Sequence, residues 1–299
     1  MEIVWLGQGE CQDCALVGGK GANLCHLAAA YRVPPAFCLT SSAFEQWRCQ
    51  DADGAATFPP ELAAPLATAY LRLGEVCGTP QPRVAVRSSA RDEDGQLASF
   101  AGQHATYLNI VGVESVAAAI LACWRSAQAP HAIEYRRHWG LSEEVAMAVL
   151  VQQLIPADVS AVVFSANPIT GNREECLINA SWGLGESLVG GNVTPDTYMV
   201  RKADLVIQQR QIADKVCMTV PAANGAREIA VPRWLRRQPA LSEDQIVEMA
   251  RLAIMLEATM GWPVDVECAY RHGELHLLQC RPITTGVRTT DDNQHHKPP

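Results

Sequence analysis

Apolar positions recur at helical spacing in several stretches of the chain. Helices are predicted over 16–30, 61–77 and 113–127. A further helix is expected after Ser242, which forms a capping-box pattern with Gln245 three residues later. The apolar residues of that last helix share one face, namely Ile246, Met249, Ala250, Ala253 and Leu256.

Short apolar runs bounded by turn residues predict strands between these helices. They cover 83–87, 105–111, 145–155, 160–164, 176–180, 264–270 and 275–281. Two polar stretches, 88–102 and 221–240, show almost no periodicity and are expected to be a loop and an irregular segment. Mixed helices and strands throughout indicate an α/β or α+β architecture.

Composition restricts the class of protein. The chain has 299 residues, of which 48% are hydrophobic and 19% charged, which suits one large or two coupled globular domains. A net charge of −8 argues against a dedicated nucleic-acid binder. No apolar run approaches the length of a membrane span, and the first residues do not resemble a signal peptide. A cytoplasmic protein is expected, with no membrane partner and with its 11 cysteines mostly reduced.

The two C-terminal strands carry polar residues in a pattern with chemical meaning. Alternation places Asp265 and Glu267 on one face of the first strand, and Gln279 and Arg281 on one face of the second. Carboxylate and amide oxygens are ligands suited to Mg²⁺, and a guanidinium suits a phosphate. A solvated hairpin face with a surface ion pair explains the same spacing equally well.

The turn between these strands decides which residues face each other. A two-residue turn would pair Glu267 with Leu278. A three-residue loop with a left-handed Gly273 would instead pair Glu267 with Gln279. Only the second register gathers carboxylate, amide and guanidinium on one surface.

Two further segments have the composition of phosphate sites. Glycines around Lys20, at the start of a predicted helix, allow close approach of an anion, although a helix-start turn with an exposed lysine fits as well. Arg87 ends an apolar strand and precedes the long polar loop 88–102, as a phosphate-covering lid requires; a surface loop is the alternative.

Other candidate chemistry has weaker support. Cys11, Cys14, Cys25 and His26 could coordinate zinc, but a second spaced pair is missing. The remaining histidines are scattered, and no Gly-x-Ser-x-Gly nucleophile elbow is present. Zinc binding and serine hydrolysis are therefore disfavoured.

Taken together, seven motifs in order resemble the nucleotide-binding domain of the phosphoenolpyruvate synthase and pyruvate phosphate dikinase family, over roughly residues 15–285. The motifs are Val17-Gly-Gly-Lys-Gly-Ala-Asn-Leu, Val33-Pro-Pro-Ala-Phe, Val86-Arg-Ser-Ser-Ala, Ser99-Phe-Ala-Gly-Gln, Gly183-Leu-Gly-Glu, Val193-Thr-Pro-Asp, and Asp265-Val-Glu with Leu278-Gln-Cys-Arg-Pro. The resemblance implies an ATP-grasp fold in which two lobes clamp ATP. The lobes would be 1–145 and 146–285, followed by a flexible tail, 286–299.

The resemblance also assigns roles at the phosphate end of ATP. Lys20, Arg87 and Arg281 would be the catalytic residues, which hold the phosphates. Glu267 and Gln279 would bind Mg²⁺ and contact the nucleotide through it. Because phosphoryl transfer depends mostly on positioning and charge neutralisation, cations and a metal at these positions suit the chemistry.

Further ATP contacts follow from the same resemblance. Ser88 follows the phosphate-binding arginine, and Gly102 and Gln103 belong to the loop that would cover the phosphates. Gln152 and Leu154 lie on the strand expected between the lobes, near the adenine. The expected cofactors are therefore ATP and Mg²⁺.

The function implied is that of an ATP-dependent phosphotransferase module. It would cleave ATP and pass a phosphoryl or pyrophosphoryl group to a carrier histidine, and then to a small acceptor, with AMP and phosphate as the family's products. Family members continue into a histidine-bearing swivelling domain, which does not follow Pro282, so a carrier domain or protein is expected as partner. Two alternatives stay open: an ATP-grasp enzyme that activates a small carboxylate or hydroxyl directly, and a non-catalytic ATP-binding protein.

Overall fold

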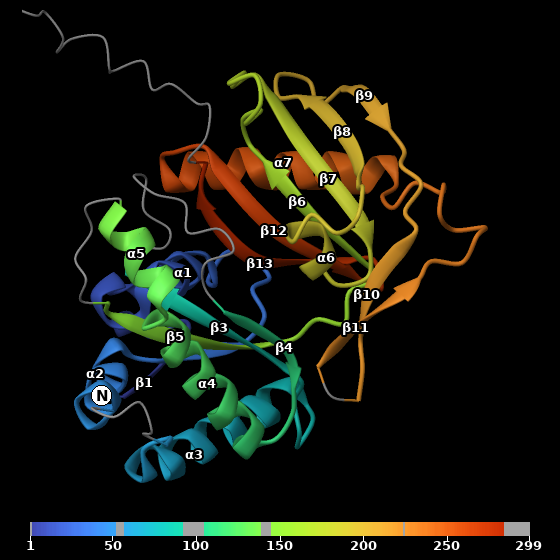
Figure 1. Ribbon diagram of the computed structural model, residues 1–299. Coiled ribbons are helices and arrows are strands. Elements are labelled where there is room, and N and C mark those ends of the chain that lie inside the picture. The colour runs from blue at the N-terminus through green and yellow to red at the C-terminus, as the bar shows by residue number, and fades with distance from the viewer. Residues whose placement is uncertain (1, 52–56, 92–104, 139–144, 224, 284–299) are drawn as a thin grey trace, which may run out of the picture.

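The computed structural model describes residues 2–51, 57–91, 105–138, 145–223 and 225–283. Two antiparallel sheets, each with its own helices, form the two lobes seen at the lower left and upper right of Figure 1. The predicted mixture of helices and strands and the predicted two lobes are both present.

The first sheet has five strands in the order β1-β2-β5-β3-β4. Its strands are β1 (Ile3–Trp5), β2 (Ala36–Leu39), β3 (Val84–Ala90), β4 (Thr106–Ile110) and β5 (Met147–Gln153). The helices of this lobe are α2 (Ser41–Gln50), α3 (Pro60–Cys77), α4 (Val113–Ala127) and α5 (Pro130–His138). The core between this sheet and its helices includes Phe37, Phe44, Trp47 and Trp124, all fully buried. β5 belongs to this sheet although it follows residue 145, and the division into 1–145 and 146–285 stays a prediction.

The second sheet has six strands in the order β13-β12-β6-β7-β8-β9. Its strands are β6 (Val159–Phe164), β7 (Glu175–Trp182), β8 (Asp196–Arg201), β9 (Ile207–Gln211), β12 (Val264–Arg271) and β13 (Glu274–Pro282). Helix α7 (Glu243–Met260) packs across one face of it. A short helix, α6 (Glu186–Val189), and a separate two-stranded hairpin, β10 (Cys217–Pro221) with β11 (Ala226–Ala230), complete the lobe (Figure 1).

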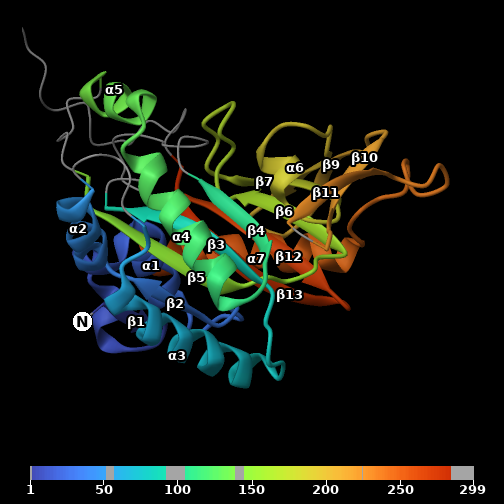
Figure 2. The same cartoon turned by 60° about the horizontal axis from the view of Figure 1, so that its bottom comes forward.

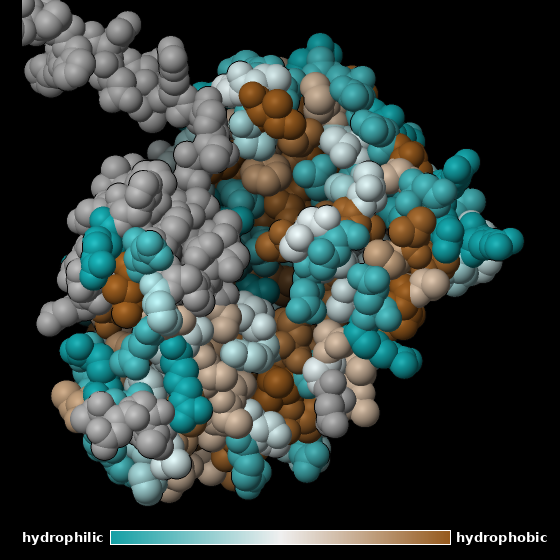
Figure 3. All heavy atoms as spheres, viewed as in Figure 1, coloured by the Kyte–Doolittle hydropathy of each residue, from teal (hydrophilic) through white to brown (hydrophobic). Residues whose placement is uncertain are grey.

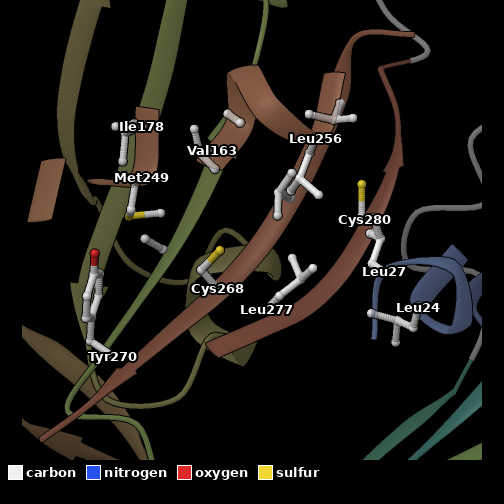
Figure 4. Packing of buried hydrophobic residues seen from close by; sticks show 14 of the residues in the cluster. Leu24, Leu27, Val163, Ile178, Met249, Leu256, Cys268, Tyr270, Leu277 and Cys280 are labelled. Atoms are coloured by element: carbon white, nitrogen blue, oxygen red, sulfur yellow. The ribbon is translucent and has the colours of Figure 1, made fainter. Parts of the chain in front are cut away.

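Helix α1 (Cys14–Leu27) packs against strands of both sheets, namely β3, β5 and β13. A 3-10 turn, η1 (Gly9–Gln12), precedes it. Leu24 and Leu27 of this helix belong to the apolar cluster that contains Leu277 and Cys280 of β13, and Figure 4 shows these side chains facing one another. A helix that is buried on both sides fixes the residues it carries relative to both lobes.

Several local predictions are confirmed. The side chain of Ser242 accepts a hydrogen bond from the Gln245 backbone, and the Gln245 side chain accepts one from Ser242, which completes the capping box of α7. The face predicted for this helix is buried against the second sheet.

Other local predictions are wrong. Ser88 belongs to β3, which continues to Ala90, because β5 pairs with it through Ala90 despite the polar sequence. Residues 226–230 form β11 rather than an irregular segment, because they pair with β10. In both places, pairing with another strand makes the segment a strand, although its own sequence shows no strand periodicity.

The register of the β12–β13 hairpin is predicted correctly, but for the wrong reason. Glu267 faces Gln279, as expected. The turn itself has two residues, His272 and Gly273, both with positive φ. A β-bulge between Glu267 and Cys268 then shifts the register by one residue, so that Leu278 is the unpaired residue.

Cysteine chemistry differs from expectation at one place. Reduced cysteines are predicted for the most part, whereas Cys11 and Cys25 form a disulfide that connects η1 to α1. This bond removes two of the four ligands of the zinc alternative. Among the described residues, no group of three or more His, Cys, Asp or Glu side chains is placed to hold a metal, and no helix is long and apolar enough to cross a bilayer.

Candidate active site

A cavity of about 350 Å³ lies between the two sheets, lined by residues of both lobes. Figure 3 shows the surface hollowed at this place, with hydrophobic and hydrophilic side chains in the hollow. The structure brings most of the residues predicted from sequence to its wall, namely Lys20, Arg87, Gln152, Leu154, Glu267, Gln279 and Arg281.

Lys20 reaches the cavity because the chain kinks within α1. Gly18 has φ +72°, and a Cβ there would lie 1.9 Å from the carbonyl oxygen of Ser89, so only glycine lets α1 pack directly on β3. The Ser89 hydroxyl donates to the Val17 carbonyl at 2.7 Å and secures the contact. Lys20 is buried, and its Nζ donates to the Ser88 carbonyl at 3.1 Å. Its ammonium is thereby held beside β3, next to Arg87.

Arg87 connects the two lobes across the cavity. Its guanidinium donates to Gln279 Oε1 at 3.1 Å and lies 3.5 Å from a carboxylate oxygen of Glu267. Arg87 is 9% exposed, and its Nε has no hydrogen-bond partner among the described residues. An unpartnered buried cationic donor is unfavourable by itself, so the site is suited to an anion.

Glu267 and Gln279 face each other across the β12–β13 pair, where the bulge puts them. Two residues further along, Arg281 Nε donates to Asp265 Oδ2 at 2.8 Å. Burial raises the pKa of Asp265, and the Arg281 guanidinium opposes that rise. The second oxygen of Asp265 is buried without a partner. At the cavity wall itself, the Glu267 carboxylate and the Gln279 amide oxygen are hard oxygen donors of the kind that Mg²⁺ prefers.

Three other residues predicted to contact ATP are not placed at the cavity wall by the described part of the structure. Ser88 is fully buried, and its hydroxyl donates to the Ala105 carbonyl at 3.2 Å, so its side chain does not line the cavity. Gly102 and Gln103, with residues 92–101 of the predicted lid, lie outside the described residues. Their assignment stays a prediction.

Sequence reasoning missed part of the cavity wall. Apolar residues of β4, of the β5–β6 connection and of the segment around α6 line it, namely Leu108, Ile155, Leu184, Leu188 and Val189. The Gly183-Leu-Gly-Glu motif contributed to the family resemblance, but the motif alone does not predict that its leucine, Leu184, lines the cavity. Gly183 has φ +78°, which turns the chain so that Leu184 meets the cavity.

Comparison with known proteins identifies the family of this chain. A family described as "Pyruvate phosphate dikinase, AMP/ATP-binding domain" matches residues 48–298. A probable phosphoenolpyruvate synthase of Methanocaldococcus jannaschii is 39% identical over 95% of this chain and 27% of its own length. A phosphoenolpyruvate synthase of Pyrococcus furiosus is 33% identical over 95% of this chain and 44% of its own.

Two further similarities complete the comparison. A rifampicin phosphotransferase of Streptomyces sviceus is 35% identical over 94% of this chain and 36% of its own length. The chain thus spans less than half the length of these curated relatives. Among solved structures, the D-alanine–D-alanine ligase of Bacillus anthracis complexed with ATP aligns with a TM-score of 0.33 at 8% identity, over 93% of this chain and 58% of the ligase.

Proposed function

Because the chain belongs to the pyruvate phosphate dikinase AMP/ATP-binding family, we propose that it binds ATP with Mg²⁺ in the cavity between its sheets and cleaves it for phosphoryl transfer. The observation that carries this proposal is Arg87, a buried cation. Its Nη1 and Nη2 contact Gln279 and Glu267 of the opposite lobe, and its Nε has no partner among the described residues. A triphosphate with its metal supplies the anion and the cation that these groups need.

Each polar residue has a role in this proposal. Lys20, Arg87 and Arg281 would hold the phosphates and neutralise the charge that develops during transfer. Glu267 and Gln279 would hold Mg²⁺, which polarises the phosphate oxygens when bound. Gln152 and Leu154 would meet the base, since Gln152 lies near the end of β5, Leu154 directly follows that strand, and both line the cavity.

The transfer itself needs an acceptor. The relatives are more than twice as long as the matching region, so there is room in them for other domains. We propose that a histidine on such a domain or on a separate protein takes the phosphoryl or pyrophosphoryl group and passes it to a small molecule. A cytoplasmic location goes with this proposal.

The test is product analysis with ATP labelled in the β or γ position, in the presence of Mg²⁺. The purified chain is incubated alone and with the histidine-bearing region of a phosphoenolpyruvate synthase, or with its His→Ala variant. AMP and a labelled carrier that form only with the intact histidine would support the proposal. ADP or AMP formed with a small molecule alone would instead indicate a self-contained ATP-grasp enzyme.

A matched pair of variants assigns the chemistry to the cavity. Glu267→Gln removes one charge from the proposed metal site and is expected to abolish Mg²⁺-dependent cleavage. Glu243→Gln removes one charge from the exposed start of α7 and should leave cleavage unchanged. Equal activity of both variants would contradict the proposed site, and binding of ATP without any product would leave a non-catalytic ATP-binding protein.

A further inference from the structure

The β10–β11 hairpin belongs to neither of the two large sheets. It leaves the second lobe and extends toward β4 of the first, as Figures 1 and 2 both show. A two-stranded hairpin is marginally stable by itself, so its contacts at either end decide where it lies.

The tip of the hairpin is hydrogen-bonded to the first lobe through one side chain. Asn109 Nδ2, from β4, donates to the carbonyls of Ala222 and Gly225 at 2.6 and 2.7 Å. Asn109 Oδ1 accepts from Arg83 at 2.6 Å. The side chain is 1% exposed and uses both donor hydrogens and its acceptor.

The backbone of Asn109 is adapted to this position. Its φ is +59°, in the left-handed region that asparagine tolerates better than most residues. The neighbouring residue, Leu108, lines the cavity. The backbone at this point therefore directs the Asn109 side chain to the hairpin, while the Leu108 side chain lines the cavity.

The middle of β10 contacts the opposite wall of the cavity. The Leu184 amide donates to the Thr219 carbonyl at 2.8 Å, and a Cβ on Gly183 would lie 2.3 Å from that oxygen. The two backbones are thus in direct contact, and Leu184 and the residues of α6 line the cavity. A displacement of β10 would be transmitted to this wall.

We propose that Asn109 is a positioning residue which, by holding the hairpin tip on the first lobe, keeps the Leu184 wall in place for the nucleoside part of ATP. The inference rests on the proposed function, since it assumes that the cavity binds ATP. The phosphate-binding residues come from α1, β3, β12 and β13, none of which the hairpin pairs with. Loss of the Asn109 contact should therefore affect the nucleoside and not the phosphates.

The test compares two ligands on two variants. Asn109→Asp keeps the size and the acceptor for Arg83 but donates nothing to the hairpin carbonyls. The second variant replaces residues 221–226 by Asn-Gly, which closes β10 and β11 with a type I′ turn and removes the tip without touching Thr219. Both should weaken ATP binding about tenfold, the loss expected from two hydrogen bonds whose effect is transmitted only in part. Affinity for inorganic tripolyphosphate should change less than twofold.

Amide hydrogen exchange measures, without any ligand, how firmly Asn109 holds the hairpin tip on the first lobe. The Leu184 amide and the hairpin amides should exchange at least tenfold faster in both variants, because the hairpin opens more often. Arg227→Gln changes an exposed residue of the same hairpin and should change neither exchange nor affinity. Unchanged exchange at Leu184, or an equal loss of ATP and tripolyphosphate affinity, would overturn the inference. If the wild-type chain binds neither ligand, the proposed function fails, whereas exchange still decides whether Asn109 holds the hairpin.

Discussion

Lys215→Met should destabilise the second lobe more than any single change at its surface. Lys215 lies two residues before β10 and forms an ion pair with Asp196 of β8 at 2.6 Å, with both side chains fully buried. The same carboxylate accepts hydrogen bonds from the backbone amides of Ala213 and Ala240. Methionine keeps the volume and flexibility of lysine, so the substitution removes charge rather than packing.

The magnitude follows from what is left behind. Breaking a buried ion pair on one side leaves an uncompensated buried charge, with a loss of about 3–5 kcal/mol in the free energy of unfolding. The two backbone amides that donate to Asp196 still stabilise its charge, so the expected loss in the free energy of unfolding is about 3 kcal/mol. By comparison, the Arg201–Asp204 pair, at the end of the same strand, has side chains 45% and 46% exposed. Arg201→Met should cost about 1 kcal/mol or less.

Native-state hydrogen exchange of β7 and β8 measures both variants in the same sheet, without assuming that the two lobes unfold together. Urea unfolding followed by circular dichroism gives an independent value. The reasoning is refuted if Lys215→Met loses no more stability than Arg201→Met. It is also refuted if the loss is spread over both lobes, since the pair lies within the second lobe.

Three further changes have defined outcomes. Arg87→Met should weaken ATP binding by about 1.5–3 kcal/mol, the value of a charge-assisted contact, and equilibrium dialysis that shows no change would remove this residue from the proposed phosphate site. Gly18→Ala should lower both the melting temperature and ATP affinity, because its Cβ meets the Ser89 carbonyl at 1.9 Å, whereas Gly78→Ala, with φ +67° and open space around it, should lose only about 1–2 kcal/mol of stability and no affinity. Ser242→Ala removes the cap of α7 and should lower stability by about 0.5–2 kcal/mol in urea unfolding, with ATP binding unchanged.

The local parts of the fold could be predicted because their causes lie within a few residues. The capping box of Ser242 joins groups three positions apart, and the alternation of Asp265 and Glu267 follows from strand geometry alone. Order along the chain also carried information, since short motifs that are weak singly identified the family together. Most predicted site residues consequently lie at one cavity.

Other features depended on contacts that no local pattern encodes. The β-bulge after Glu267 sets the register by an unpaired Leu278, although the two-residue turn alone would predict a different pairing. Cys11 of η1 and Cys25 of α1 form a disulfide, and nothing in their spacing distinguishes this pair among 11 cysteines.

The sequence by itself determined the class of fold, the family and most of the polar residues that line the cavity. Only the tertiary structure decided that Arg87 contacts Glu267 and Gln279, and that Asn109 holds the hairpin. The physical reason is separation along the chain: Arg87 and Glu267 are 180 residues apart, and Asn109 and Ala222 are 113. Periodicity describes neighbours within a helix or strand, whereas these contacts arise when two lobes, each folded around its own core, are brought together.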